Sequence, residues 1–241
     1  MPYTQLGAVN TWWDEHGAGD PVVLLHPGGA DSRAFDVTLA LADALHVYRF
    51  DRRGHGRTAD VDGPIGYAQM ADDTAAFLTE VVGGPAHLVG HSDGAPVALL
   101  TALRHPGLVR RLVFASGVFH HEGWRPGVLD LDDEATEFLS SWYGEVSPDG
   151  PAHWPVVAAK LDRMHRTEPV LTTADLAGIE TPTLLMFGDD DEVEPPHLHA
   201  LHRGLSNVQL AIVPGAGHGV LLDRPELCHL MIRDFLSSTE M

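Results

Sequence analysis

The sequence predicts an α/β fold with a mainly parallel central sheet and helices on both faces. Short apolar runs alternate with longer amphipathic stretches along most of the chain. This alternation is typical of a parallel sheet that helices cover. The chain has 241 residues, of which 44% are hydrophobic, so a single large core can form without disulfides or metals.

The first half of the chain supplies the expected elements in close succession. Strands are expected at residues 9–15, 21–26, 47–50, 86–90 and 112–115, and helices at 32–45, 67–82 and 94–104. Apolar positions with helical spacing make the core candidates of the first two helices, which are Phe35, Leu39, Leu41, Leu45, Met70, Phe77, Leu78 and Val81.

The alternation breaks between residues 118 and 177. Helical patterns at 132–143 and 152–166 occur there without a buried strand, together with three of the five tryptophans. We interpret 118–177 as a helical lid inserted into a core made of 1–117 and 178–241. Further strands at 183–187 and 208–213 and helices at 196–203 and 225–236 complete the expected core.

Charge and cysteine content restrict the classes of function. Fifteen basic residues against 34 acidic ones give a net charge of −19, and such an acidic surface repels nucleic-acid phosphates. The single cysteine, Cys228, cannot form an internal disulfide, which favours a reducing compartment. The first ten residues lack a signal-peptide pattern, and the apolar runs are far shorter than the ~20 residues of a membrane helix. We therefore expect a cytoplasmic protein with a small-molecule substrate and no nucleic-acid or membrane partner, as a monomer or a homodimer.

The sharpest motif is G-H-S-D-G at residues 90–94, between an expected strand and an expected helix. A strand–turn–helix of this kind holds its serine in a strained conformation with positive φ, and the flanking positions must be small. Gly90 and Gly94 meet that demand. Ser92 would then stand at a helix N-terminus, where free N–H groups favour a developing anion. Ser92 is therefore the candidate nucleophile.

A serine nucleophile needs a base, and the chain has sixteen histidines. His218 lies in a loop of small residues directly after the expected strand at 208–213. The acidic run at 189–192, after another expected strand, offers four carboxylates that could orient the base. Other histidines cluster without any zinc-site spacing, so no metal is expected; these are His120, His121, His197, His199 and His202.

Five motifs together resemble the α/β-hydrolase superfamily. They are H-P-G-G at 26–29, D-R-R-G-H-G-R at 51–57, G-H-S-D-G at 90–94, G-D-D-D at 188–191 and P-G-A-G-H at 214–218. The resemblance covers the chain apart from the expected lid and implies an α/β-hydrolase fold with esterase- or lipase-like activity and no cofactor. The chain order Ser, Asp, His is the one this fold uses. The family pattern Gly-x-x-Asp implies that Asp191 is the acid.

The resemblance also implies an oxyanion hole formed by the backbone N–H groups of Gly28 and Asp93. The chain departs from the family at Pro27, where glycine is usual, although the missing N–H is not one of the two assigned donors. The block at 51–57 is implied to be structural, with arginines that pair with nearby acids.

Specificity is expected to come from the lid and from residues beside the nucleophile. The candidates for the substrate pocket are Gly29, His91, Asp93, Trp124, Trp142 and Trp154. For the tryptophans, the alternative is that they only pack the lid onto the sheet. Asp93 is unusual, because many relatives carry an uncharged residue there. Its carboxylate either favours a cationic substrate or points away and makes a structural hydrogen bond.

The expected reaction is hydrolysis of a small-molecule ester, thioester or lactone. Ser92 would form an acyl-enzyme, with His218 as general base and Asp191 as the acid that orients it. The same triad could instead serve a C–C bond hydrolase or a cofactor-free haloperoxidase. Outside the enzymes, the chain could be a small-ligand receptor or an accessory protein on a hydrolase scaffold, because fold alone does not determine function.

Overall fold

The computed structural model describes residues 3–238, which contain an eight-stranded sheet in the order β1-β2-β4-β3-β5-β6-β7-β8. β1 (Tyr3–Leu6) and β2 (Val9–Gly17) pair antiparallel, as do β2 and β4, and the other pairs are parallel. The parallel strands are β3 (Pro21–Leu25), β4 (His46–Phe50), β5 (Ala86–His91), β6 (Val109–Ala115), β7 (Thr183–Gly188) and β8 (Val208–Val213). The expected mainly parallel sheet is confirmed.

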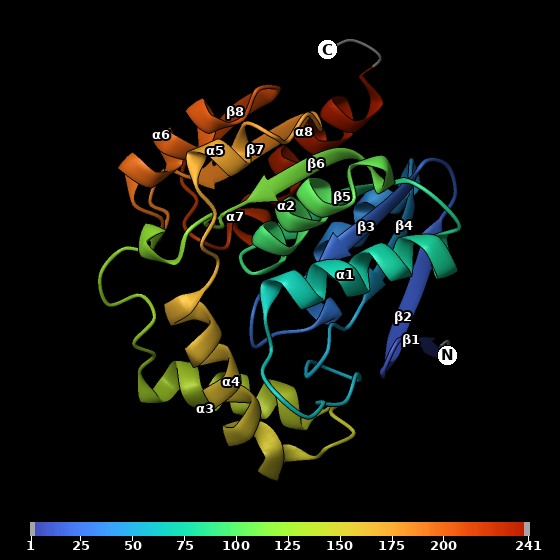
Figure 1. Ribbon diagram of the computed structural model, residues 1–241, viewed down its shortest axis with the longest axis vertical. Helices are drawn as coiled ribbons and strands as arrows, with labels where there is room; N and C mark the ends of the chain where they lie inside the picture. The colour runs from blue at the N-terminus through green and yellow to red at the C-terminus, as the bar shows by residue number, and fades with distance from the viewer. Residues whose placement is uncertain (1–2, 239–241) are drawn as a thin grey trace.

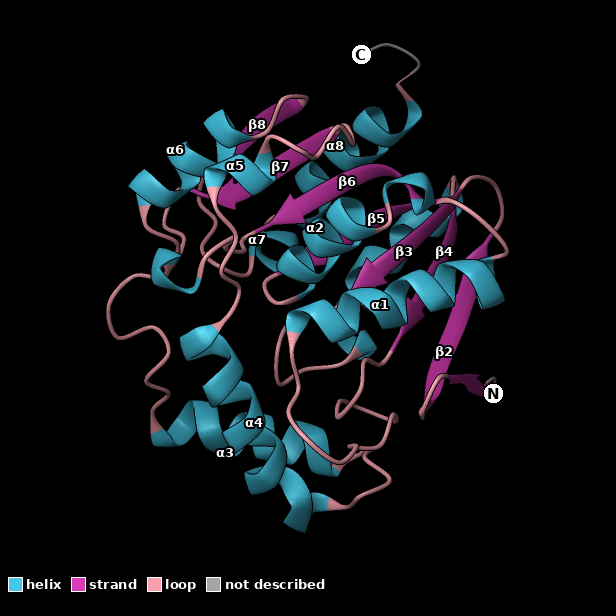
Figure 2. Ribbon diagram, in the orientation of Figure 1, coloured by secondary structure: helices cyan, strands magenta, loops and turns pink. Residues whose placement is uncertain are grey.

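Helices cover both faces of this sheet (Figures 1 and 2). One face packs against α1 (Tyr67–Phe77), α2 (Gly94–Arg104) and α6 (Pro195–Gly204). The other face packs against α7 (Val220–Asp223), α8 (Pro225–Ser237) and the 3₁₀ helices η1 (Ser32–Phe35) and η2 (Val37–Asp43). The central strands are apolar on both sides, as expected of a sheet that is covered on both faces.

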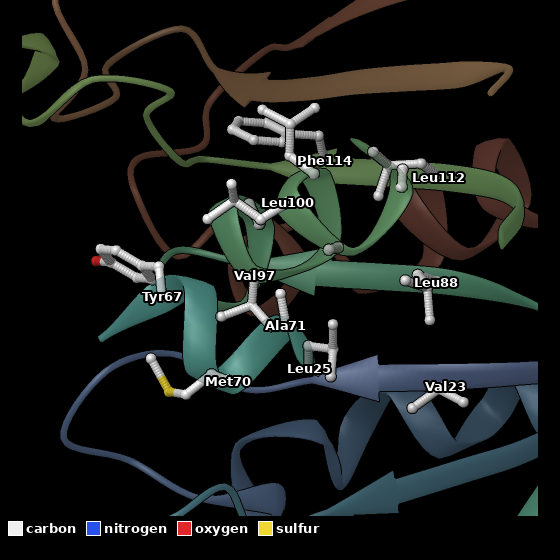
Figure 3. Packing of buried hydrophobic residues seen from close by; sticks show 14 of the residues in the cluster. Val23, Leu25, Tyr67, Met70, Ala71, Leu88, Val97, Leu100, Leu112 and Phe114 are labelled. Atoms are coloured by element: carbon white, nitrogen blue, oxygen red, sulfur yellow. The ribbon is translucent and has the colours of Figure 1, made fainter. Parts of the chain in front are cut away.

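The core is closely packed beneath the motif at 90–94. Val23 and Leu25 of β3 and Leu88 of β5 pack with Val97 of α2, and all four side chains are fully buried (Figure 3). Burial of this kind contributes ~1.5–3 kcal/mol for each large apolar side chain. The turn between β5 and α2 therefore rests on a rigid support.

The segment between β6 and β7 forms α3 (Asp133–Gly144), α4 (Trp154–Thr167) and the short α5 (Thr173–Leu176). α3 and α4 lie together at one end of the molecule, away from the strands (Figure 1). α5 instead packs against α6, and Leu176 contacts Gly204 there. The division of the chain into a core and a lid stays a prediction.

Two expected helices differ in the structure, and one strand, β1, is additional. The helix expected at 32–45 is two 3₁₀ helices, although Phe35, Leu41 and Leu45 are buried as expected. The helix at 67–82 continues from α1 into a π-helix, Leu78–Val82, which ends at Gly83 with φ of +83°. β1 was not predicted, because a four-residue edge strand has too few positions for a clear alternation. Within residues 3–238, no helix has the length and apolar character needed to cross a bilayer.

Candidate active site

Ser92 occupies a tight turn between β5 and α2. Its φ of +53° lies in the left-handed region, which non-glycine residues rarely adopt without a local constraint. A Cβ on Gly90 would lie 2.1 Å from the Gly94 carbonyl oxygen, and one on Gly94 would lie 1.8 Å from the Leu25 carbonyl oxygen. Glycine is therefore required at both positions, and the turn places the Ser92 hydroxyl beyond the end of β5.

Ser92, His218 and Asp191 form a continuous hydrogen-bonded chain. Ser92 Oγ lies 3.0 Å from His218 Nε2, and His218 Nδ1 lies 3.2 Å from Asp191 Oδ1. The three residues follow β5, β8 and β7, so the carboxyl ends of neighbouring parallel strands bring them together. In this geometry the imidazole can accept the serine proton while Nδ1–H donates to the carboxylate.

The Asp191 carboxylate is fixed by three further donors. Ser116 Oγ–H donates to Oδ2 at 2.6 Å, Gly188 N–H to Oδ2 at 3.2 Å and Glu192 N–H to Oδ1 at 2.8 Å. Burial alone would raise the pKa of Asp191, but its hydrogen bonds to His218, Ser116 and Gly188 outweigh burial and lower the pKa. The acid is therefore held ionised.

Ser116 is a site residue that sequence reasoning missed. It directly follows β6 and has a φ of +48°, the second positive-φ non-glycine residue among those described. The available signal was its position, because a small polar residue directly after a buried strand lies at the sheet edge where the other site residues gather.

His218 is held from two sides. Burial lowers its pKa, but the Asp191 hydrogen bond and the charges of Glu192 and Asp191 outweigh burial and raise the pKa above its ordinary value. His91 Nε2–H donates to the His218 carbonyl at 2.8 Å. Burial lowers the pKa of His91 to about 4, so this ring is neutral. Its role is to hold the backbone carbonyl of His218 in place. The ring of Trp124 lies edge-on to His218 with centroids 5.6 Å apart.

The loop after β3 carries the candidate oxyanion donor Gly28. Arg52 N–H donates to His26 Nε2 at 3.0 Å, which leaves the proton on Nδ1, and that N–H donates to the Pro27 carbonyl at 2.7 Å. Arg52 Nη2 also donates to the Pro27 carbonyl, at 3.2 Å. Both bonds orient the Pro27–Gly28 peptide. In residues 3–238, nothing accepts a hydrogen bond from the N–H groups of Gly28 and Asp93.

The arginines of the block at 51–57 only partly follow the expectation. Arg53 pairs with Asp73 at 2.7 Å and Arg57 with Asp51 at 3.2 Å. Pairing with an acid is wrong for Arg52, which is buried and donates to the carbonyl oxygens of the loop after β3. Through Arg52, this block therefore holds the loop after β3 that carries Gly28.

The Asp93 side chain is buried and fully hydrogen-bonded. Tyr67 O–H donates to Oδ1 at 2.7 Å, and His165 Nε2–H of α4 donates to Oδ2 at 2.9 Å. Burial alone would raise the pKa of Asp93, but the charge and hydrogen bond of His165 and the charge of Arg52 lower it below its ordinary value. With both oxygens occupied by protein donors, the structure favours the structural alternative for this carboxylate over cation recognition.

Two adjoining cavities lie at this site. The smaller, about 80 Å³, is lined by Gly28, Ser92, Asp93, Trp124, Leu129, His165, Glu192 and His218. The larger, about 160 Å³, is lined by Gly28, Gly29, Val128, Leu129, Leu131, Leu139, Trp154, Ala158, Leu161, Asp162 and His165. Gly28, Leu129 and His165 line both, so the cavities meet there. The first contains the polar groups and the second is mostly apolar.

The pocket candidates occupy different places. Asp93 and Trp124 line the smaller cavity, and Gly29 and Trp154 line the larger one. Trp142 lies outside both lining sets, and the guanidinium of Arg33 sits 4.2 Å from the centre of its ring. His91 is buried behind His218 and lies outside both lining sets as well. Within residues 3–238, no cluster of three or more His, Cys, Asp or Glu side chains has a geometry suited to a metal ion.

Sequence comparison assigns this chain to a family. The sequence profile of the alpha/beta hydrolase family matches residues 22–229, which include all five motifs. The chain therefore belongs to the alpha/beta hydrolase family, and the predicted fold and family are confirmed.

Individual relatives are distant but match over nearly the full length. The chain is 26% identical to the putative carbamate hydrolase RutD of Azorhizobium caulinodans, over 98% of each protein. It is 28% identical to a pimeloyl-[acyl-carrier protein] methyl ester esterase of Neisseria meningitidis serogroup B, over 89% of this chain and 92% of the esterase. The crystal structure of the enol-lactonase of Burkholderia xenovorans LB400 superposes with a TM-score of 0.79 at 19% identity, covering 98% and 100% of the two chains. That last likeness concerns the fold.

Proposed function

We propose that this protein is a serine hydrolase that cleaves a small-molecule ester, thioester or lactone. The observation that carries the proposal is the hydrogen-bonded chain from Ser92 through His218 to Asp191 at the wall of a cavity. The names of two relatives, a carbamate hydrolase and a methyl ester esterase, both denote attack on an acyl carbon, which agrees with it.

In the first step Ser92 Oγ attacks the acyl carbon while His218 Nε2 takes the hydroxyl proton. The negative charge that develops on the acyl oxygen is stabilised by the N–H groups of Gly28 and Asp93. The His218 imidazolium, stabilised by Asp191, then gives its proton to the leaving alkoxide or thiolate. In the second step water loses a proton to the same imidazole and attacks the acyl-enzyme, which releases the acid and regenerates Ser92.

The two cavities divide the substrate between them. The smaller holds the reacting acyl group, because Ser92 and His218 line it. The larger takes an apolar substituent, because leucines and Trp154 dominate its wall. A substrate with a short or medium-length apolar chain fits this division.

The test is steady-state hydrolysis of p-nitrophenyl esters from C2 to C8 by the wild type, Ser92→Ala and a control, Ser141→Ala. Ser141 lies on α3 outside the lining of both cavities, so its variant should keep wild-type turnover. We expect many turnovers per wild-type molecule and a loss in Ser92→Ala of at least about 10⁴-fold in kcat. Product formation that stops near one equivalent of enzyme would favour the hypothesis of a small-ligand receptor. Equally slow rates in the wild type and both variants would refute ester hydrolysis.

A further inference from the structure

His165 occupies a special position in the site. It comes from the last turn of α4, outside the sheet, yet it lines both cavities at the point where they meet. A Cβ on Gly28 would lie 3.1 Å from His165 Nε2, so the imidazole is next to the loop that carries the candidate oxyanion donor. None of the proposed catalytic steps uses this residue.

The two nitrogens of His165 face different surroundings. Nε2 donates to Asp93 Oδ2 at 2.9 Å. Nδ1 has no hydrogen-bond partner in the part of the chain that the structure describes, and it is not among the buried polar atoms that lack one. The side chain is 21% exposed. Nδ1 is therefore accessible, in a side chain that lines both cavities.

The ion pair with Asp93 at 2.9 Å favours the protonated form of His165. Burial and the charge of Arg52 lower its pKa, but the charge and hydrogen bond of Asp93 outweigh them and raise it, with a smaller contribution from Asp162. Tyr67 occupies the other oxygen of Asp93, and burial and Asp93 raise the pKa of Tyr67 well above its ordinary value, so Tyr67 stays a donor. An imidazolium paired with a carboxylate in this way presents an N–H at Nδ1.

The ligand group that suits this donor is a neutral oxygen acceptor. Asp93 already balances the charge of His165, and Glu192 lines the same small cavity, so a substrate carboxylate would meet a like charge there. A carbonyl oxygen accepts the Nδ1–H bond without that repulsion. Beyond it, the apolar wall of the larger cavity, with Leu139, Leu161 and Trp154, suits an alkyl tail.

We propose that His165 recognises a second carbonyl oxygen in the substrate, between the scissile carbonyl and an apolar tail. A 3-oxoacyl ester or thioester is a substrate of this kind, because its second carbonyl lies two bonds from the scissile one and His165 lines both cavities beside the Gly28 loop. This inference rests on the proposed hydrolase function and assigns its substrate class. His165 is a specificity-determining residue in this account, and Asp93 and Tyr67 position it.

The experiment compares two thioesters that differ only in the second carbonyl, the N-acetylcysteamine thioesters of octanoate and 3-oxooctanoate. The measured quantity is the ratio of kcat/KM for the 3-oxo substrate to that for the plain one. A hydrogen bond from a charged donor gives an effect of about tenfold or more. We therefore expect His165→Phe to lower the ratio about tenfold relative to the wild type, and His165→Gln, which keeps a neutral donor, to lower it less.

The matched control is His153→Phe. His153 precedes α4 and pairs with Asp60 at 2.9 Å, so it is also a histidine bonded to a carboxylate, but it lies outside both lining sets. Its variant should keep the wild-type ratio. An unchanged ratio in His165→Phe overturns the inference, and if that variant does not fold, an unchanged ratio in His165→Gln does so.

Failure of the hydrolase function is a separate result. If neither the thioesters nor the p-nitrophenyl esters are turned over, the proposed function fails, and the inference is decided by binding alone. The probes are then 2,4-nonanedione and 2-nonanone, with quenching of tryptophan fluorescence as the readout, because Trp124 and Trp154 line the cavities. Tighter binding of the dione that is lost in His165→Phe supports the inference, and equal dissociation constants overturn it.

Discussion

Two histidine–carboxylate pairs flank Ser92, and they are built in opposite ways. In the pair of His218 and Asp191, Nδ1 faces the acid and Nε2 faces the serine at 3.0 Å. In the pair of His165 and Asp93, Nε2 faces the acid, Nδ1 has no partner in residues 3–238, and the side chain lines both cavities. The first pair joins two loops at the sheet edge, whereas the second joins α4 to the turn after β5.

The residue types in the two pairs do not distinguish their roles. Both histidines are largely buried, and in both the paired acid raises the pKa. What separates them is the surroundings of the imidazole nitrogen that does not face the acid. A serine hydroxyl makes the first ring a candidate base, and an open cavity makes the second a candidate recognition group. Variants that treat the two pairs alike test this distinction directly.

The largest expected contrast is between Asp191→Asn and Asp93→Asn. An amide at 191 favours the wrong tautomer of His218, which in a serine protease triad lowers kcat by about 10⁴-fold. We expect a loss of that order. Asp93 faces the other histidine, so its amide should change kcat by less than about tenfold. Single-turnover acylation rates would measure both, and equal losses would contradict the assignment of His218 as the base.

The hydroxyl groups behind the two acids give a second, smaller contrast. Ser116→Ala removes the 2.6 Å donor of Asp191, and Tyr67→Phe removes the 2.7 Å donor of Asp93. Hydrogen bonds to a charged group contribute about 1.5–3 kcal/mol, so kcat should fall about 10- to 100-fold in Ser116→Ala. Tyr67→Phe should leave kcat for a plain ester nearly unchanged. A larger kcat loss in Tyr67→Phe than in Ser116→Ala would reverse the roles of the two pairs.

The pH profile of kcat/KM sharpens the comparison further. His218 must be neutral to act as a base, and its raised pKa places the acidic limb of the profile above the ordinary histidine value of 6.5. Glu192 lies 3.8 Å from His218 Nδ1 and contributes to this shift, so Glu192→Gln should move the limb to lower pH. Asp190→Asn is the control, because Asp190 is 89% exposed and pairs with Arg125. An acidic limb that does not move in Glu192→Gln would show that Glu192 does not raise the pKa of His218.

The smallest expected effect is on thermal stability. The raised pKa of His165 means that its ion pair stabilises the fold below pH 6.5 and that this stabilisation is lost as the pH rises through the folded-state pKa. The lowered pKa of Asp93 means that its share is present above about pH 4 and lost at lower pH. The Tm advantage of wild type over His165→Gln should therefore be greatest between about pH 4 and 6.5. An advantage that grows toward pH 9 would show that the pair is not ionic.

Much of the fold and the motifs around Ser92 and His218 could be predicted from local sequence patterns, whereas the choice of Asp191 among four acids came from the family resemblance. The glycines at 90 and 94 are required by contacts within a few residues and with the neighbouring strand, so the turn around Ser92 is visible in the motif. The helix expected at 32–45 had the right apolar positions but the wrong geometry. Its Asp31 side chain caps the 3₁₀ helix η1 by accepting from Arg33 N–H, and such short-range polar bonds compete with an α-helix.

The pair of His165 and Asp93 could not be predicted from the sequence, because it joins distant segments and no motif marks His165. His165 and Asp93 are 72 residues apart, and no local pattern pairs them. The tryptophans illustrate the same limit, since Trp154 lines a cavity while Trp142 lies against Arg33. Helical spacing places both on helices, but the choice of neighbour depends on how α3 and α4 pack.

The attachment of α4 has a consequence for how a substrate reaches Ser92. Lys160 Nζ lies 2.7 and 2.8 Å from the two carboxylate oxygens of Asp60, which is largely buried, and His165 is bonded to Asp93. The adjoining segment 125–132 supplies cavity wall but is tied by exposed ion pairs, such as Arg166 with Asp130, which contribute little. Displacing 125–132 therefore opens the cavity at a lower free-energy cost than lifting α4. The more easily displaced part of the cavity wall is thus the 125–132 loop, and the more firmly held part is α4.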